Sequence, residues 1–221
     1  MKIRYTILST CVVCVVAIAI GLYNKSNYQD FNTQNEPLLN FEVGLISEPV
    51  VASQIERMRK TLDETPIIIA ARCESKSHFL FSCTYQTVTV EKVFKGNDIC
   101  AGDSIKISKT GSVFSLDGYG NGYHSINTGF VNEMTPGMTY LIFIQNKLNN
   151  ADLFMVDNNL LIKPIFCYES FDNTIVQSQS DDASYTAYKN VKDNEYFFDS
   201  ESAYQLMYDY KSELLVQYPL D

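Results

Sequence analysis

The amino-acid sequence predicts a mainly β fold, a small antiparallel barrel or sandwich with a short N-terminal helix and a C-terminal helix. About six runs rich in β-branched and aromatic residues follow one another at short intervals, without a helical pattern between them. The 221-residue chain is 46% hydrophobic and 19% charged, which is typical of a globular protein with a packed core. We expect a hydrophobic leader or membrane anchor in front of this domain.

The N-terminal segment carries the pattern of a leader or anchor. Residues 5–23 (YTILSTCVVCVVAIAIGLY) contain no charged side chain and follow the basic residues Lys2 and Arg4. An uncharged run of about 18 residues is long enough to span a bilayer, and the basic residues predict that the remainder is exported. Residues 17–19 (AIA) have the small-x-small form of a signal-peptidase site. A cleaved signal peptide and an anchor in the cytoplasmic membrane both remain open, and either makes the protein extracytoplasmic.

The first part of the exported chain is expected to be a tether. Residues 24–46 are rich in Asn and Gln and lack a lasting periodicity, which predicts a polar linker. The domain is then expected to span residues 47–221. Within it, apolar residues recur at helical spacing over residues 51–62, which predicts a short amphipathic helix that ends before Pro66.

The end of the chain also has a helical pattern. Residues 199–217 (DSESAYQLMYDYKSELLVQ) begin with acidic and serine residues, carry apolar residues on one face and stop before Pro219. This pattern predicts a C-terminal helix whose apolar face packs on the barrel.

Between the two helices, the residue pattern has the two-residue period of strands. Residues 67–73 and 79–94 are expected to pair as a long hairpin, and residues 157–159 (DNN) are turn formers that join the last two strands as a second hairpin. The predicted strands are residues 67–73, 79–94, 103–109, 138–145, 152–156 and 160–166.

Four cysteines lie outside the hydrophobic segment, and outside the cytoplasm an even number favours disulfides. Cys73 and Cys83 flank a polar turn between two apolar runs, so they are expected to face each other across a hairpin. By elimination, Cys100 would pair with Cys167. Free thiols are the open alternative. Zinc binding is not expected, because the four cysteines lack the close spacing of zinc ligands.

The charge of the chain argues against nucleic-acid binding. The 17 Lys and Arg against 26 Asp and Glu give a net charge of −9. Residues 1–23 contain two basic and no acidic residues, so the remainder carries −11. A protein that neutralises phosphates needs the opposite sign. We expect a protein or envelope ligand as the partner and no nucleic acid.

A glycine-rich stretch between two predicted strands is the candidate binding loop. Residues 117–124 (DGYGNGYH) contain three alternating glycines, but a phosphate loop must join a strand to a helix, and neither neighbour is helical. Loops between strands often carry recognition. Tyr119, Tyr123 and His124 are therefore the expected contact residues.

The sequence lacks the motifs of common catalytic sites. The two histidines, His78 and His124, do not have the spacing of a metal pair, and no GxSxG, HExxH or P-loop motif occurs. We predict that the protein is not an enzyme and uses no catalytic residue, cofactor or metal ion. An extracytoplasmic hydrolase remains an alternative if folding brings together a nucleophile and a base that are distant in sequence.

The order of motifs resembles the netrin-like, or tissue-inhibitor-of-metalloproteinase-like, OB-fold family. The resemblance covers about residues 67–166 and rests on residues 70–73 (AARC), 88–96 (VTVEKVFKG), 102–107 (GDSIKI) and 136–144 (PGMTYLIFI). It implies a five-stranded OB-like barrel with a helix against it, used for protein interaction more than for catalysis.

One departure from that family limits what the resemblance implies. The metalloproteinase inhibitors chelate the zinc of their target with a free N-terminal cysteine, whereas a chain that starts at Met1 or near Ile20 lacks that cysteine. No site residue is therefore transferred. The leading hypothesis is an exported or membrane-tethered, non-enzymatic binding domain of the cell envelope. An exported protease inhibitor that acts through a surface loop is the alternative.

Overall fold

The computed structural model of the chain describes residues 2–27, 30–80, 83–109, 113–115, 124–148, 152–157, 159–176 and 185–220. The chain divides into two compact units, Met1–Asn35 and Glu36–Asp221. Each unit is described by itself.

The first unit consists mainly of helix α1, Lys2–Asn27, which contains the uncharged run. A short 3-10 helix, η1 (Phe31–Thr33), follows, and the Asp30 carboxylate caps it by accepting from the Asn32 backbone N–H at 3.0 Å. Among the described residues, no helix is both long enough and apolar enough to be a candidate membrane span. The membrane anchor predicted at residues 5–23 is therefore not supported.

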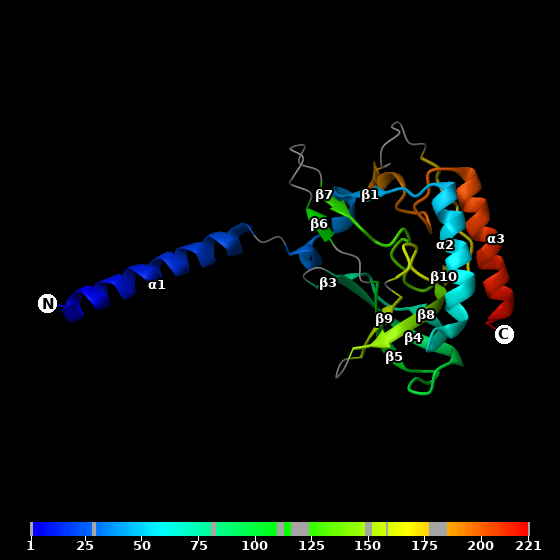
Figure 1. Cartoon of the computed structure of the whole chain (residues 1–221), viewed down its shortest axis with the longest axis horizontal. Coiled ribbons are helices and arrows are strands. Elements are labelled where there is room, and N and C mark those ends of the chain that lie inside the picture. The colour runs from blue at the N-terminus through cyan, green and yellow to red at the C-terminus, as the bar shows by residue number, and fades with distance from the viewer. Residues whose placement is uncertain are drawn as a thin grey trace. The chain divides into compact units, whose positions relative to one another are not determined.

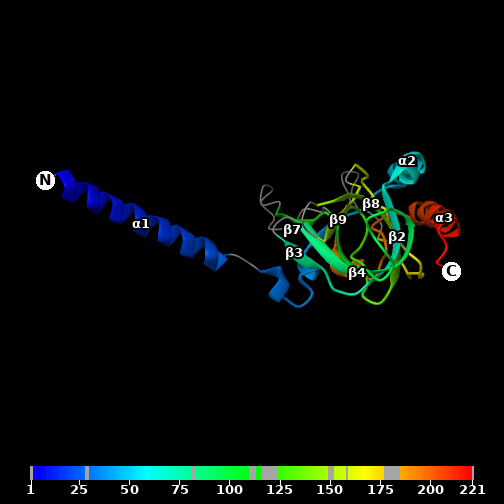
Figure 2. The ribbon, with the colours of Figure 1, turned by 90° about the horizontal axis from the view of Figure 1, so that it is seen from below.

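The second unit is built around a closed five-stranded barrel, which confirms the mainly β prediction (Figure 1). Each strand pairs with the next in the order β2-β4-β5-β9-β8, and β8 pairs with β2 to close the ring. Figure 2 shows the barrel nearly end-on. Its strands are β2 (Ile67–Cys73), β4 (Cys83–Lys95), β5 (Ser104–Ser108), β8 (Thr139–Lys147) and β9 (Leu153–Val156).

One pairing corrects the prediction of a wholly antiparallel barrel. Strands β5 and β9 are parallel, with Ile107 opposite Phe154, and the other four pairings are antiparallel. A parallel pair needs a crossover rather than a hairpin. Here the crossover runs through β8, which lies between β5 and β9 in the sequence and pairs with β9 in the ring.

Side-chain alternation explains why these segments are strands. Along β4 the residues alternate between buried and partly exposed from Cys83 to Val90, as the sequence predicted. In β2, four consecutive residues, Ile68–Ala71, are buried, so both faces of this strand are covered. The apolar stripes of two helices belong to the same hydrophobic cluster as β2 and cover its outer face.

The two predicted helices of this unit are confirmed. Helix α2, Glu48–Thr61, has Pro49 in its first turn and buries Val51, Ile55 and Met58. Helix α3, Glu201–Gln217, is capped by the Ser200 hydroxyl, which accepts from the Ala203 N–H at 3.4 Å. The two helices lie side by side against the barrel (Figures 1 and 2).

A second, four-stranded sheet was not predicted. Its strands follow the order β11-β1-β7-β6 and have three residues each. We call it the cavity sheet; its strands are β1 (Glu42–Gly44), β6 (Val113–Ser115), β7 (His124–Ile126) and β11 (Tyr185–Ala187).

The cavity sheet corrects the boundary expected for the linker. Residues 24–46 were expected to be a polar tether, but the compact unit begins at Glu36, and Leu38, Phe41 and Val43 are buried in it. The apolar residues in this stretch are too few and irregular to show a period, yet they pack once β1 pairs with β7 and β11.

The remaining elements correct one predicted hairpin and confirm the other in part. Strand β10 (Ile165–Cys167) pairs with β8 and not with β9, so the turn at 157–159 does not join paired strands. Strand β2 pairs antiparallel with β4, as predicted, but strand β3 (His78–Leu80) also pairs with the start of β4, so residues 79–94 are not one strand. Three further 3-10 turns are η2 (Pro37–Asn40), η3 (Leu62–Glu64) and η5 (Tyr188–Asn190).

The predicted disulfides are wrong, because all six cysteines are free thiols. Cys73 lies opposite Val88 in the β2–β4 pair, five positions from Cys83, which is about 17 Å along the strand. Cys100 is exposed in the turn before β5, whereas Cys167 is buried on β10. Strands β8, β2 and β4 lie between β10 and β5 in the sheet order.

Candidate ligand-binding cavity

A cavity of about 370 Å³ lies on the cavity sheet. This volume is within the range of small-molecule sites, about 300–1,000 Å³. The sheet contributes Val43 and Gly44 of β1, Ser125 and Ile126 of β7, and Tyr185 of β11. These strands are distant in sequence, and the parallel pairing of β1 with β7 brings them together.

The rest of the lining comes from two segments that follow the sheet strands. Asn127, Thr128 and Phe130 follow β7 directly, and Phe197 precedes α3. We call residues 127–134 the arch, because they lead from β7 towards the barrel strand β8. None of the nine described lining residues is charged.

Gly44 leaves space between two of the aromatic rings. A Cβ atom at this position would lie 3.5 Å from Cε1 of Phe130 and 3.7 Å from Cε1 of Tyr185, which are ordinary van der Waals distances. A side chain on residue 44 therefore points between rings that line the cavity. Tyr185 is 53% exposed and lies at the solvent side of the lining, whereas Phe197 is buried.

The turn at the start of the arch has an unusual backbone. Gly129 and Phe130 both have positive φ angles, +69° and +57°. A left-handed conformation is rare for a bulky residue such as phenylalanine and is seen most often where the surrounding structure imposes it. Here the Asn127 side chain accepts from the Gly129 N–H at 2.8 Å, and the Phe130 carbonyl accepts from the Phe197 N–H at 3.1 Å.

Thr128 is the buried polar group of the lining. The residue is only 4% exposed, and its hydroxyl has no hydrogen-bond partner among the residues that the structure describes. A buried hydroxyl without a partner costs about 1–3 kcal/mol, so most buried hydroxyls are paired.

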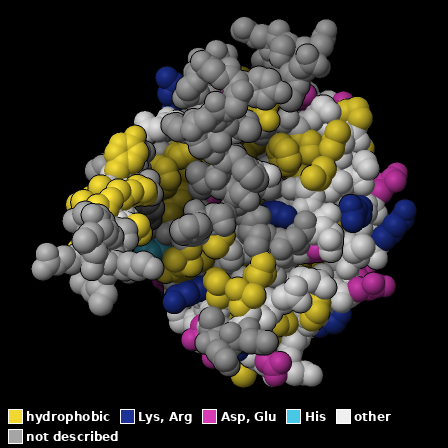
Figure 3. Space-filling view, turned by 60° about the vertical axis from the view of Figure 1, so that its left-hand side comes forward, with side chains coloured by type: hydrophobic (Ala, Val, Ile, Leu, Met, Phe, Trp, Pro, Cys, Tyr) yellow, Lys and Arg dark blue, Asp and Glu magenta, His cyan; other side chains and the backbone are white. Residues whose placement is uncertain are grey.

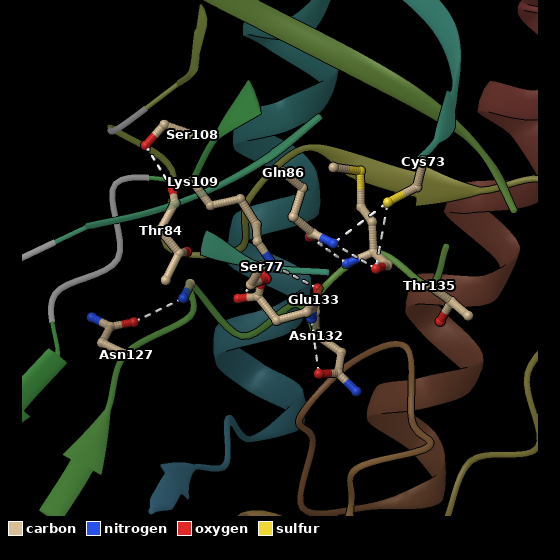
Figure 4. Close-up of polar contacts among 12 residues, drawn as sticks. Cys73, Ser77, Thr84, Gln86, Ser108, Lys109, Asn127, Asn132, Glu133 and Thr135 are labelled. Carbon is tan, nitrogen blue, oxygen red and sulfur yellow. Dashed lines mark hydrogen bonds and ion pairs between the residues drawn. The ribbon is translucent and has the colours of Figure 1, made fainter. Parts of the chain in front are cut away.

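Asn132 anchors the middle of the arch (Figure 4). Its side-chain amide donates to the carbonyls of Lys192 and Asn194 at 2.7 and 2.8 Å. Its side-chain oxygen accepts from the Tyr188 hydroxyl and the Glu133 N–H, both at 2.8 Å. All four of these hydrogen bonds connect the arch to itself or to the chain around η5.

A buried ion pair fixes the arch to strand β5. The Lys109 ammonium donates to the Asn132 carbonyl at 2.6 Å and lies 3.3 Å from the Glu133 carboxylate. The Ser77 hydroxyl donates to the other oxygen of that carboxylate (Figure 4). Burial lowers the pKa of Lys109, and the charge of Glu133 opposes this change.

Gln86 of β4 holds the end of the arch. Its amide donates to the Met134 carbonyl at 2.7 Å, and its oxygen accepts from the Met134 N–H at 2.8 Å. The same amide lies 3.4 Å from the Cys73 sulfur. Burial raises the pKa of the Cys73 thiol to about 11, so this thiol is protonated at neutral pH and is a poor nucleophile.

A second buried ion pair joins helix α3 to the segment that precedes Phe197. The Lys211 ammonium of α3 contacts the Glu195 carboxylate at 2.6 Å, and both side chains are almost fully buried. The same carboxylate accepts from the Cys167 N–H at 2.9 Å. Burial raises the pKa of Glu195, and the ammonium of Lys211 opposes this effect.

Of the three loop residues predicted to contact a ligand, the structure describes His124. Tyr119 and Tyr123 lie outside the described residues. His124 is the first residue of β7, and the next residue, Ser125, lines the cavity. The other histidine, His78, lies on β3 with its ring 4.9 Å from that of Tyr85.

The buried polar side chains near the arch are paired with one another. Within the described part of the chain, no group of three or more His, Cys, Asp or Glu residues is arranged to hold a metal ion. The Ser77 hydroxyl donates to Glu133, and the described hydrogen bonds of the Lys109 ammonium go to Asn132 and Glu133. This arrangement satisfies a buried ion pair.

On the face shown in Figure 3, the charged side chains of the described residues are of both signs. There, Lys and Arg side chains alternate with Asp and Glu side chains, and hydrophobic side chains form separate groups between them. A protein that binds nucleic acid usually gathers its basic residues on one face.

No known protein-family model matches the chain, and no curated protein is similar to it in sequence. The resemblance to the netrin-like family therefore stays a prediction.

The sequence pattern did not indicate the cavity. Residues 127–129 (NTG) are turn formers directly after an apolar residue, and this was the available signal for a sharp turn at the site. The lining aromatic residues 130, 185 and 197 lie far apart in the chain, and nothing in their local pattern shows that they meet.

Proposed function

We propose that the unit Glu36–Asp221 is a non-enzymatic binding domain that holds its ligand at the cavity between the cavity sheet and the arch. The observation that carries this proposal is the cavity itself, a space of about 370 Å³ whose described lining residues include three aromatic rings and no charged side chain. Pockets of this kind, mostly apolar with few polar groups, are the usual form of ligand sites.

The way in which the arch is held supports a site whose walls are fixed before a ligand arrives. Asn132, Lys109 and Gln86 use their polar atoms to fix the backbone of the arch. A binding site gains affinity when its walls are rigid before the ligand arrives, because less conformational entropy is lost on binding.

The location and family of the protein are proposals on sequence grounds. The uncharged run after Lys2 and Arg4 supports export by a signal peptide. The strand order supports an OB-like description: numbered along the chain, the five barrel strands follow the order 1-2-3-5-4, with strands 3 and 5 parallel. The netrin-like resemblance is consistent with a binding role.

The proposal can be tested by photo-crosslinking from the mouth of the cavity. Tyr185 is replaced by p-benzoylphenylalanine in the full chain, which is then irradiated in its own cells. We expect an adduct from position 185 that is lost when Gly44→Leu fills the cavity. Val216, which is 82% exposed on α3 and is not a lining residue, is the matched control position.

The outcome separates the functional classes. Equal adducts from positions 185 and 216, or an adduct from 185 that survives Gly44→Leu, would contradict binding at the cavity. A protease found in the adduct would identify the inhibitor alternative. An absence of any adduct from position 185 would also count against the proposal.

A further inference from the structure

Two sulfur atoms meet where strand β10 ends beside the start of β8. The Sγ atom of Cys167 lies 3.9 Å from the Sδ atom of Met138, the residue that precedes β8. We infer that this sulfur pair binds a soft monovalent cation of the copper(I) type, with the Cys167 thiolate and the Met138 thioether as its two ligands. The inference goes beyond the proposed function, because neither residue is in the described lining of the cavity. It also departs from the sequence-based expectation that the protein holds no metal ion.

Strand pairing holds both sulfur-bearing residues in place. Cys167 lies opposite Tyr140 in the antiparallel pair of β8 and β10, and Met138 is two residues from Tyr140, so the two side chains are diagonal neighbours. The Met138 carbonyl accepts from the Cys73 N–H at 2.9 Å. The Cys167 N–H donates to the Glu195 carboxylate at the same distance of 2.9 Å. The two ligands are therefore positioned before an ion arrives, which reduces the cost of binding.

The separation of the two sulfur atoms suits a single ion. A zinc–thiolate bond is about 2.3 Å long, and bonds of similar length from two sulfurs to one ion would span at most about 4.6 Å. Sulfur atoms 3.9 Å apart can therefore both bond to an ion between them while the strands stay paired. Thiolate and thioether ligands select soft ions such as copper(I), whereas carboxylates and carbonyls suit magnesium, calcium or manganese.

The lone pairs of both sulfur atoms are available to such an ion. The Cys167 thiol donates to Oε2 of Glu169 at 3.0 Å, and a thiol has only one proton to donate. The contact with the Met138 sulfur is therefore not needed as a hydrogen bond. The Tyr140 hydroxyl lies 4.0 Å from that sulfur, and a thioether is a weak acceptor, so this contact does not compete strongly with a cation.

Binding exchanges a proton for the cation. The S–H bond of Cys167 breaks, a bond between the sulfur and copper(I) forms, and the proton passes to the Glu169 carboxylate and from there to solvent. No electron is transferred. Burial raises the pKa of the Cys167 thiol because it disfavours the bare thiolate, and a bound cation would supply the positive charge that the thiolate lacks.

An ion can reach the sulfur pair from solvent. The Cys167 side chain is fully buried, but Met138 is only partly buried and Glu169 is exposed. The ion would enter from the side of these two residues and would then be shielded from water on the side of the core.

A second buried thiol lacks this arrangement. Cys73 is as buried as Cys167, but its described contacts are the carbonyls of Ser75 and Met134 and the side-chain amide of Gln86. Oxygen and amide groups are poor ligands for a soft ion. Cys73 is therefore a matched control, a buried thiol without a thioether sulfur among its described contacts.

Copper(I) itself is the probe for the test. The other free thiols would also bind it, so the full chain is prepared with Cys11→Ser, Cys14→Ser, Cys83→Ser and Cys100→Ser. Without oxygen, this chain competes for copper(I) with bicinchoninate, whose copper complex is coloured. We expect the chain to retain one ion.

Three further substitutions in this chain locate the ion. Loss of an outer partner of a metal ligand already costs about 10–100-fold in affinity, so loss of a ligand should cost at least as much. Cys167→Ala and Met138→Leu should each weaken copper(I) binding at least about tenfold, although leucine keeps the volume of methionine. Cys73→Ala should leave the affinity within about twofold.

Selenium gives a readout that a packing role for Met138 would not produce. The chain is grown with selenomethionine, and X-ray absorption at the copper edge identifies the atoms bonded to copper. We expect one sulfur and one selenium neighbour, and loss of the selenium neighbour in Met138→Leu.

Several results would overturn the inference. A chain with the four serine substitutions that no longer binds copper(I) would show that only the other thiols are ligands. Affinity that is unchanged by Met138→Leu, or copper without a selenium neighbour, would remove the thioether from the site. Equal losses in Cys73→Ala and Cys167→Ala would show that the sulfur pair is not the site. If Cys167→Ala unfolds in a thermal melt, Met138→Leu and the selenium measurement decide alone.

Discussion

The barrel contains the long strand β4, with 13 residues, whereas each strand of the cavity sheet has three residues and the arch that follows β7 is held by buried polar contacts. In β4, burial alternates over eight residues, and Val88 and Val90 pack in the hydrophobic core. In the arch, Asn132 alone makes four side-chain hydrogen bonds. Apolar packing tolerates substitution, while a buried polar network depends on every member. The stability of the region with the cavity should therefore be more sensitive to single substitutions than the stability of the barrel.

The largest expected effect is at the buried ion pair between Lys211 and Glu195. Lys211→Met should lower the free energy of unfolding by about 3–5 kcal/mol, because it leaves the Glu195 carboxylate buried without its partner. Urea denaturation measures this. Adding Glu195→Gln to Lys211→Met should restore a large part of the loss. A double variant no more stable than Lys211→Met would show that the unpaired charge is not the cause.

The second-largest loss of stability is expected when Asn132, the anchor of the arch, is replaced. Asn132→Ala should lower the free energy of unfolding by about 3 kcal/mol, because the Tyr188 hydroxyl and two carbonyls lose their hydrogen-bond partner. The matched change in the barrel, Ile69→Val, should cost only about 1 kcal/mol.

Hydrogen exchange on the Asn132→Ala variant sharpens the comparison. Amides of β1 and β7 should exchange faster, while those of β4 and β8 keep their protection. Equal loss of protection in both sheets would mean that the barrel and the cavity sheet unfold as one unit and that our distinction is wrong.

A smaller effect is expected at the left-handed turn. A Cβ on Gly129 would lie 2.3 Å from Cγ of Lys163, so Gly129→Ala should cost about 2 kcal/mol from backbone strain and displacement of that buried side chain. Gly102→Ala is the control: Gly102 also has a positive φ, +93°, but nothing lies within 4 Å of its Cβ position. Equal losses of stability, measured by thermal melts, would assign the whole cost to the backbone.

The smallest expected effect is a pH dependence in the barrel. The pKa of Cys73 is about 11 in the folded state and about 9.0 when unfolded, so the unfolded chain releases its proton first as the pH rises. The protonated thiol makes its full contribution to the free energy of unfolding below pH 9. This contribution should fall by about 1 kcal/mol by pH 10. Cys73→Ala should lose less stability between pH 8 and 10 than the unchanged chain. An equal loss would contradict the assignment.

Most of the barrel and both of its helices could be predicted from the sequence, because their patterns are long. The period-two alternation of β4 and the helical spacing from Val51 to Met58 each extend over several residues. The strand partners were harder to predict: residues 160–166 were paired with the wrong neighbour, because a turn signal such as DNN shows a reversal but not which strand follows it.

The cavity sheet and the cavity could not be predicted, for a physical reason. A three-residue strand such as β1 contains too few residues to show a period, and it is stable only through its partners β7 and β11. Asn132, which fixes the arch, has the local pattern of an ordinary loop residue. The cysteine pairing failed because β3 inserts a hairpin between Cys73 and its expected partner.

The pairing of β1 with β11 has a consequence for synthesis of the chain. Glu42 lies opposite Ala187, so about two thirds of the chain separates the two strands. Pairing between such distant segments is slow, because the loop entropy must be lost before the contact forms. During translation the apolar residues around β1 emerge early and wait for residues 185–187, while the barrel strands from 67 to 156 can already assemble. The cavity sheet is thus completed only after all five barrel strands have been synthesised.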